Sequence, residues 1–129
     1  MFNWRRPDNL GVKDARLAPC KRSPNCVSSQ ADPADREHYI SPIAYRGSMQ
    51  ELRRAVESMA RATVITAERN YLYAEYRTKL MRYVDDLELY YDERAGLVHV
   101  RSASRLGRRD FGVNRKRVEA LRSLIQSRR

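Results

Sequence analysis

Apolar residues follow two different periods along this chain. After Ser48 they recur at intervals of three and four positions, at Met49, Leu52, Val56 and Met59. This spacing gathers them on one side of a helix. Ser48 and Glu51 have the spacing of a capping box, in which each side chain satisfies a free amide at the start of a helix. The pattern therefore predicts a helix that begins at Ser48.

From Thr63 the period changes to two. Four segments rich in β-branched and aromatic residues are separated by turn-forming residues: Thr63–Glu68, Tyr71–Arg77, Tyr83–Tyr91 and Leu97–Ser102. Alternation of this kind predicts β-strands, and the short connections favour an antiparallel meander.

Alternation also assigns the side chains to two faces of this sheet. One face is apolar and carries Leu72, Ala74, Tyr76, Leu87, Leu89, Val98 and Val100. The opposite face is polar and carries Tyr73, Glu75, Arg77, Asp86, Glu88, Tyr90, His99, Arg101 and Arg105. We expect the helices to cover the apolar face, as in an α+β sandwich.

A second helix is predicted near the end of the chain, where Val118, Leu121 and Ile125 form an apolar stripe. Asn114 is the expected N-cap. The fold class predicted is α+β, a four-stranded antiparallel sheet with two helices on one face. Residues 1–47 contain all 5 prolines and show no period, so they are expected to form an irregular arm packed on a helix–four strands–helix unit over residues 48–129. At 129 residues the whole is predicted to be a single domain.

The net charge of +10 is unevenly distributed. Residues 1–47 carry +3, residues 48–92 carry −1, and residues 93–129 carry +8. A one-sided excess favours a local anion site over a uniformly basic surface. No known nucleic-acid-binding module is present, so specific nucleic-acid binding is not expected. No apolar run is long enough to span a bilayer or to serve as a signal peptide, so the chain as given is expected to be cytoplasmic.

The basic excess centres on the segment from Arg101 to Arg117. Arginine forks, loop amides and the start of a helix are the parts of a phosphate or carboxylate site. The candidate ligand-binding residues are Arg101, Ser102, Ser104, Arg105, Asn114, Arg115 and Arg117. The alternative is a structural ion-pair network with the nearby carboxylates, Asp85, Asp86, Glu88 and Asp110.

The first turn of the last helix breaks a local rule. Arg115, Lys116 and Arg117 stand where the helix dipole disfavours cations. A compensating negative group is therefore expected close by, either Asp110 or a bound anion.

Two other sets of residues were considered for chemistry. Asp86 and Glu88 share a face, but neighbouring arginines are expected to occupy them, so neither a metal nor a cofactor is predicted. Cys20 and Cys26 are expected to be packed thiols. The alternatives are a disulfide or redox pair, and a zinc site completed by His38 and His99.

Several spaced motifs, in order, resemble one family. They are Leu10-Gly11-Val12, Leu17-Ala18-Pro19-Cys20, Ser23-Pro24-Asn25-Cys26-Val27-Ser28-Ser29-Gln30, His38-Tyr39-Ile40, Tyr83-Val84-Asp85-Asp86, and Arg101-Ser102-Ala103-Ser104-Arg105 through Gly112-Val113-Asn114-Arg115 with Arg117. This series resembles the bacterial and plastid family known as domain of unknown function 1499. The resemblance covers nearly the whole chain from about Leu10, and it implies no activity, cofactor or catalytic residue.

Three functions are compatible with these patterns. The first is a small binding or interaction module, in which the arm from Cys20 to Ser29 and the arginines frame a pocket for a small anion or a protein partner. The second is an enzyme or redox protein that uses Cys20 or Cys26, and the third is a structural adaptor with a scaffold of arginine ion pairs. The sequence leaves both enzymatic activity and the oligomeric state open.

Overall fold

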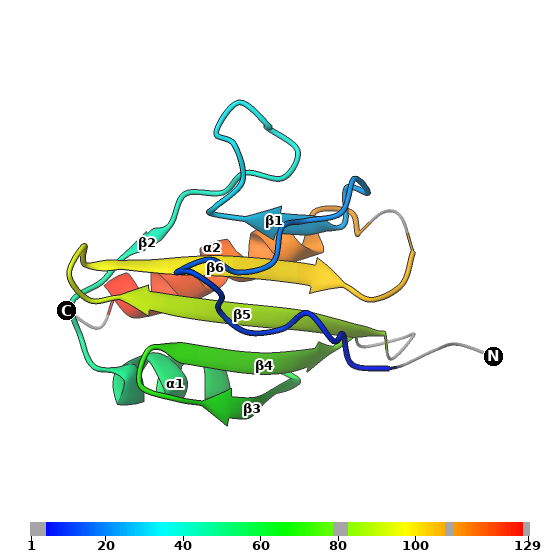
Figure 1. Ribbon diagram of the computed structural model, residues 1–129. Coiled ribbons are helices and arrows are strands. Elements are labelled where there is room, and N and C mark those ends of the chain that lie inside the picture. Colours follow the sequence, from blue (N-terminus) through cyan, green and yellow to red (C-terminus); the bar gives the residue numbers. More distant parts are fainter. Residues whose placement is uncertain (1–4, 79–82, 108–109, 128–129) are drawn as a thin grey trace.

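The computed structural model describes residues 5–78, 83–107 and 110–127. Within these residues the chain forms an α+β fold with two helices and one sheet of six antiparallel strands (Figure 1). In chain order the elements are β1 (Cys26–Ser28), β2 (Ile43–Ala44), α1 (Met49–Glu57), β3 (Ala62–Ala67), β4 (Tyr71–Arg77), β5 (Val84–Asp92), β6 (Leu97–Ser104) and α2 (Val113–Gln126). The strand order is β1-β6-β5-β4-β3, and β2 pairs with another part of β6.

The four strands predicted from alternation are β3 to β6, and they form the meander that short connections favoured. The prediction of a four-stranded sheet was nevertheless wrong, because β1 and β2 add two strands from the arm. Cys26 lies opposite Ala103 and Ile43 lies opposite Val98, so both short strands complete the outer edge of β6. Strands of three and two residues are too short to show a period, and only the unpaired edge of β6 gives them a partner.

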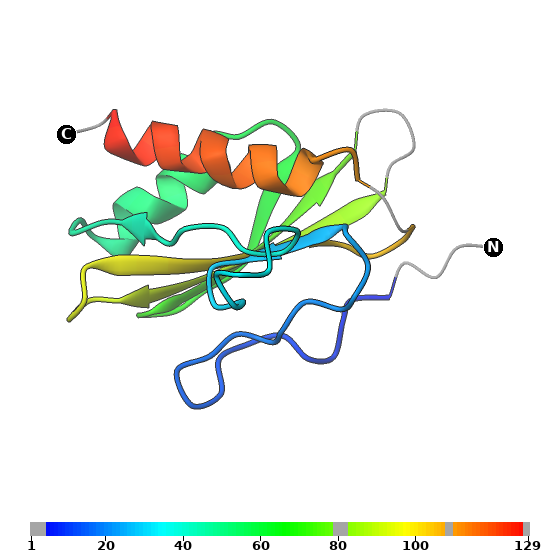
Figure 2. The ribbon, with the colours of Figure 1, turned by 90° about the horizontal axis from the view of Figure 1, so that it is seen from above.

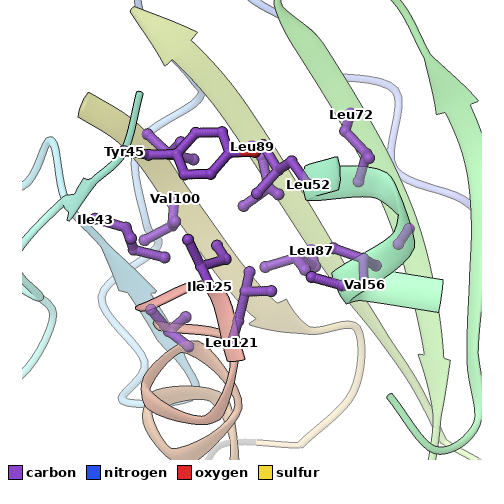
Figure 3. Close-up of a cluster of buried hydrophobic side chains, with 14 of the residues drawn as sticks. Ile43, Tyr45, Leu52, Val56, Leu72, Leu87, Leu89, Val100, Leu121 and Ile125 are labelled. Carbon is purple, nitrogen blue, oxygen red and sulfur yellow. The ribbon is translucent and has the colours of Figure 1, made fainter. Parts of the chain in front are cut away.

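The apolar face of the sheet packs against both helices (Figure 2). The core combines α1 and α2 with alternate residues of the central strands, including Leu52, Val56, Leu72, Leu87, Leu89, Val100, Leu121 and Ile125 (Figure 3). All seven apolar-face residues predicted from alternation are buried in it. Neither helix in the described part of the chain is long and apolar enough to cross a membrane.

The two helices begin differently. Ser48 caps α1 as predicted, since its side chain accepts a hydrogen bond from the Glu51 amide at 3.1 Å. The prediction that Asn114 caps α2 was wrong. The N-cap residue is Gly112, with φ of +77°, and Asp110 supplies the side-chain oxygens that accept from the amides of Gly112 and Asn114.

The polar face of the sheet is covered by the first part of the arm, so that the sheet lies between the helices and the arm (Figure 2). Three contacts attach the arm there. Arg6 pairs with Glu75 at 2.8 Å, the Gly11 amide donates to Glu88 at 2.8 Å, and Arg101 donates to the carbonyl of Pro19 at 3.4 Å. Covering this face buries charged side chains that would otherwise meet water.

Candidate functional site

Arg101 lies on β6 and points toward the arm. Only 6% of the residue is exposed, yet its guanidinium group is incompletely paired. Nη2 donates to the Pro19 carbonyl at 3.4 Å, Nη1 is 3.9 Å from Glu88 Oε1, and Nε has no hydrogen-bond partner among the described residues. Burial lowers the pKa of Arg101, and the carboxylates of Glu88 and Asp86 oppose that shift. Arg101 Nε is one of three buried side-chain polar atoms without a partner in the described residues, and it is the one that belongs to a cation.

Glu88, opposite Arg101 on β5, is fully buried. Its Oε2 accepts hydrogen bonds from the Gly11 amide at 2.8 Å and from the Tyr71 hydroxyl at 2.6 Å. Its Oε1 has no hydrogen-bond partner within the described part of the chain. The Glu88 and Arg101 side chains thus form a loose ion pair at 3.9 Å, without the close, forked contact that arginine makes with carboxylates.

A pocket of about 430 Å³ lies beside Arg101, between the arm and the end of β6. Four cationic residues line it, Arg5, Lys21, Arg101 and Arg105. Two acidic residues, Asp8 and Asp86, also line it. The lining is therefore net positive, and loops of the arm supply polar groups from Ser23 and Asn25.

Arg105 faces the same side of the sheet, but its charge is satisfied by protein carboxylates. Nη2 lies 2.6 Å from Glu75 Oε2 and 2.8 Å from Asp86 Oδ1, and Nε donates to Asp86 Oδ2 at 2.9 Å. These contacts, led by the hydrogen bonds that Arg105 donates to Asp86, raise the pKa of Arg105 above its usual value. Arg105 therefore belongs to an ion-pair network. The sequence had predicted such a network, with Asp86 among its carboxylates, as the alternative to a ligand site.

Ser102, Asn114 and Arg117 form a second group on the helix side of the sheet. Ser102 and Asn114 are fully buried, and Ser102 Oγ donates to Asn114 Oδ1 at 2.6 Å. Arg117 pairs with Asp85 at 2.9 Å and lies over the ring of Tyr76, 4.4 Å from its centroid. Burial raises the pKa of Asp85 although Arg117 opposes this shift. This group joins α2 to the sheet.

Ser104 lies at the boundary between these groups. It lines the pocket beside Arg101, and its Oγ accepts a hydrogen bond from Asn114 Nδ2 at 2.9 Å.

Arg115 lies apart from the pocket beside Arg101 and from the group around Asn114. It donates to the backbone carbonyls of Tyr39, Arg36 and Glu37, and so attaches α2 to the arm.

The structure therefore divides the seven predicted ligand-binding residues. Arg101, Ser104 and Arg105 line one pocket, whereas Ser102, Asn114, Arg115 and Arg117 contact other parts of the protein. Arg101 and Arg105 are separated from Ser102 because adjacent residues of a strand point to opposite faces, and Ser104 reaches the pocket at the end of β6 although it shares the face of Ser102. The negative group expected near the first turn of α2 is present as Asp110, which accepts from the backbone amides of that turn. The family motif also includes Arg108 and Arg109, which lie outside the described residues.

Cys20 and Cys26 form a disulfide, so the expectation of packed thiols was wrong. The arm bends over residues 22–25 and brings Cys20 beside Cys26 of β1. A spacing of six residues does not by itself require the two cysteines to be so close. With both sulfurs paired, the alternative of a zinc site is also excluded in this state. Cys26 lines the pocket beside Arg101, and Cys20 lines a separate one of about 340 Å³ that also contacts His38.

The loop closed by this disulfide supplies pocket residues that the sequence indicated only as part of the arm from Cys20 to Ser29, and not as individual ligand-binding candidates. Lys21, Ser23 and Asn25 all lie within it. Asn25 is buried and donates to the Gly107 carbonyl at 2.6 Å, which fixes the loop against the turn after β6. The Ser-Pro-Asn-Cys motif was the available signal, but only the fold brings it to Arg101.

The fold and the pocket define a small α+β protein whose polar sheet face is covered by its own N-terminal arm. The chain belongs to the DUF1499 family, since the family model described as "Protein of unknown function (DUF1499)" matches residues 16–125. This confirms the resemblance seen in the sequence motifs. No curated protein and no solved structure is similar enough to this chain to count as a match.

Proposed function

We propose that this protein is a binding module for a small anion, a phosphate or a carboxylate, held in the pocket beside Arg101. The single observation that carries the proposal is the buried Nε of Arg101, which has no acceptor among the described residues. Because Nε itself is shielded, an anion in the pocket would interact with the charge of the Arg101 guanidinium group, which the protein pairs only loosely, at 3.4 Å and 3.9 Å.

The charge of the pocket supports the same ligand class. Lys21 is exposed at the pocket wall, and Arg101 is buried behind it. Together they offer one mobile and one fixed cation, a combination suited to a ligand with one or two negative charges. Extended polyanions suit it less well, because Asp8 and Asp86 interrupt the positive lining.

Ligand binding can be tested by thermal-shift titration with phosphate, nucleotides and small carboxylates at constant ionic strength. A ligand that binds only the folded state raises the melting temperature with increasing concentration. We expect saturable stabilisation by at least one of these anions, and none from chloride at equal ionic strength. Absence of stabilisation by all of them would overturn the proposal.

Lys21→Gln tests the pocket with little risk to the fold, because Lys21 is exposed. Loss of a charged hydrogen bond should weaken anion binding about tenfold or more. Arg22→Gln is the matched control, since this exposed neighbour carries the same charge and does not line the pocket. Equal effects of the two substitutions would indicate general electrostatic attraction instead of a pocket.

Arg101 requires a paired design, because its removal alone leaves Glu88 buried without its cation. The double variant Arg101→Gln with Glu88→Gln removes both charges together. We expect this protein to fold and to lose anion binding, measured by calorimetry at a temperature where it is folded. Retained affinity would show that Arg101 does not contact the ligand.

The disulfide favours a second candidate, a redox protein that uses Cys20 and Cys26. The pair borders two pockets and closes the loop that carries Lys21. Such a protein would exchange electrons with dithiol reductants at a rate well above that of a simple structural disulfide. Slow reduction by dithiothreitol in the native state, with fast reduction in urea, would instead assign the bond a structural role.

A further inference from the structure

The outer strand β3 has features of a surface that pairs with another strand. It is the last strand in the sheet order, so its outer backbone edge faces no other described strand. Its six residues, Ala-Thr-Val-Ile-Thr-Ala, include no charge, glycine or proline. Ile65 is 38% exposed on this strand, one of few large apolar side chains exposed in the described residues. Edge strands usually carry charges or prolines that prevent such pairing.

The sequence of β3 is almost the same in both directions. Read backwards it differs only by the exchange of Val64 and Ile65. The residues that flank it, Arg61 and Glu68, are exposed and have opposite charges. Neither forms a salt bridge with another described residue. An antiparallel pair of two such strands would bring each Arg61, in the turn just before β3, close to the Glu68 of the second copy.

The β-bulge in this strand makes that register compatible with the faces of the sheet. Val64 lies opposite Ala74 and Thr66 lies opposite Tyr73, so Ile65 is an extra residue. Because of it, Ala62 and Ala67 both lie opposite core residues of β4. In a regular strand two residues five apart point to opposite faces. Ala62 of one copy could then not pair with Ala67 of the second copy.

Thr63 and Thr66 likewise share one face of the sheet, the face opposite to that of Ala62 and Ala67. Thr63 lies opposite Glu75 and Thr66 lies opposite Tyr73, both on the side of the sheet covered by the arm. In the two-fold register each Thr63 would lie opposite the Thr66 of a second copy. Cross-strand threonine pairs and opposite charges are both favourable arrangements in antiparallel sheets.

We propose that two copies of this chain associate through β3, so that their sheets join into one antiparallel sheet across a two-fold axis between Val64 and Ile65. The interface is isologous, with one Arg61–Glu68 contact at each end. This inference goes beyond the anion pocket and does not depend on it, since β3 lies at the opposite edge of the sheet from β1.

Sedimentation equilibrium over a concentration series tests the association. For a chain of 15.1 kDa the average mass should rise toward twice that value as concentration increases. Each copy carries +10, so the measurement belongs at about 0.15 M salt, where charges more than about 8 Å apart are screened. A mass that stays at one chain at all concentrations would overturn the proposal.

Charge reversal locates the interface. Arg61→Glu alone brings two glutamates together at each end, and Glu68→Arg alone brings two arginines together. We expect either variant to associate at least tenfold more weakly than the original chain. An equal mixture of the two should associate again, because every contact in the mixed pair then joins opposite charges. Failure of the mixture to recover would show that Arg61 and Glu68 do not meet.

Two matched controls come from the exposed turn between β5 and β6. Arg94→Glu and Glu93→Arg change the net charge by the same amounts at residues remote from β3 in the fold. They should associate as the original chain does. If they weaken association equally, net charge and not β3 pairing controls it, and the proposal fails. Circular dichroism and the unfolding midpoint should show that all four variants remain folded.

Discussion

Ser102 Oγ on β6 donates a 2.6 Å hydrogen bond to Asn114 Oδ1 in the first turn of α2. The amide group of the same asparagine donates to the Asn25 carbonyl, to Ser104 Oγ and to Asp110 Oδ2. One fully buried side chain therefore connects the helix, the central sheet and the arm. Polar groups buried together in this way specify one arrangement of the elements they join.

Asn114→Ala should destabilise the protein by about 3 kcal/mol, because it leaves several buried polar atoms without partners. Urea unfolding measures this as a lower midpoint with an unchanged slope. Ser123→Ala is the control, since Ser123 is exposed on the same helix and should change stability by less than about 0.5 kcal/mol. An equally small effect of Asn114→Ala would contradict a linking role for this residue.

Arg105→Gln should cost about 3–5 kcal/mol at neutral pH, because it leaves Glu75 and Asp86 buried without their shared cation. Burial alone would raise the pKa of Glu75, but hydrogen bonds from Arg6 and Arg105 lower it below its usual value of 4.5. A lowered carboxyl pKa stabilises the fold above pH 4.5, and this stabilisation is lost as the pH falls through the folded value.

The cost of Arg105→Gln should therefore shrink when unfolding is measured at progressively lower pH. Adding Asp86→Asn should recover part of the lost stability, because it removes the buried charge that has lost its cation, whereas Glu75 keeps its pair with Arg6. If the double variant is as unstable as the two single losses added together, Arg105 and Asp86 act independently and the network interpretation is wrong.

Replacing both Cys20 and Cys26 by serine should lower stability by about 2 kcal/mol, the amount that chain entropy predicts for so short a closed loop. The same variant should bind anions more weakly, since Lys21 would no longer be held at the pocket wall. Mass spectrometry after alkylation provides the direct check. The unreduced native protein should take up no label, and the reduced protein should take up two, because the chain has 2 cysteines.

The two histidines should titrate on opposite sides of the usual value of 6.5. Burial alone would lower the pKa of His38, but contacts with the Ser23 carbonyl and the Asp35 carboxylate raise it. Burial lowers the pKa of His99, with Arg16 acting in the same direction and Asp92 opposing it. NMR titration of the imidazole resonances measures both values, and the reverse order would contradict the environments described.

The raised pKa of His38 also predicts how stability depends on pH. A histidine whose pKa is raised by folding stabilises the protein fully below 6.5, and this stabilisation is lost as the pH rises through the folded value. The difference in stability between the original chain and His38→Gln should therefore be larger at pH 5.5 than at pH 8. A difference that does not vary with pH would mean that folding does not shift the pKa of His38.

The local pattern of apolar and polar residues was sufficient to predict the central strands and the two helices. Leu72, Leu87 and Val98 are buried, as their alternation predicts, because the two-residue period of a strand places them on one face whatever follows elsewhere. The same rule placed Arg101 and Arg105 on the polar face. The alternation rule could not distinguish Arg101 from Arg105, because it assigns both arginines to the same face.

The environments of these two arginines depend on segments distant in sequence. Arg105 meets Glu75 and Asp86 from neighbouring strands, whereas Arg101 meets the Pro19 carbonyl, which only the folded arm brings there. The disulfide, the two short strands and the pocket depend on the arm in the same way. An arm without a period gives no local signal for where it will lie.

The sequence by itself determined the α+β class, the meander, the apolar face and the family, because each follows from residue types at short, regular spacing. Only the tertiary structure decided which arginines are paired and which one retains an unused donor. That distinction rests on contacts across 19 and 30 residues of chain between strands for Arg105, and across 82 residues between the arm and the sheet for Arg101, where no local period applies.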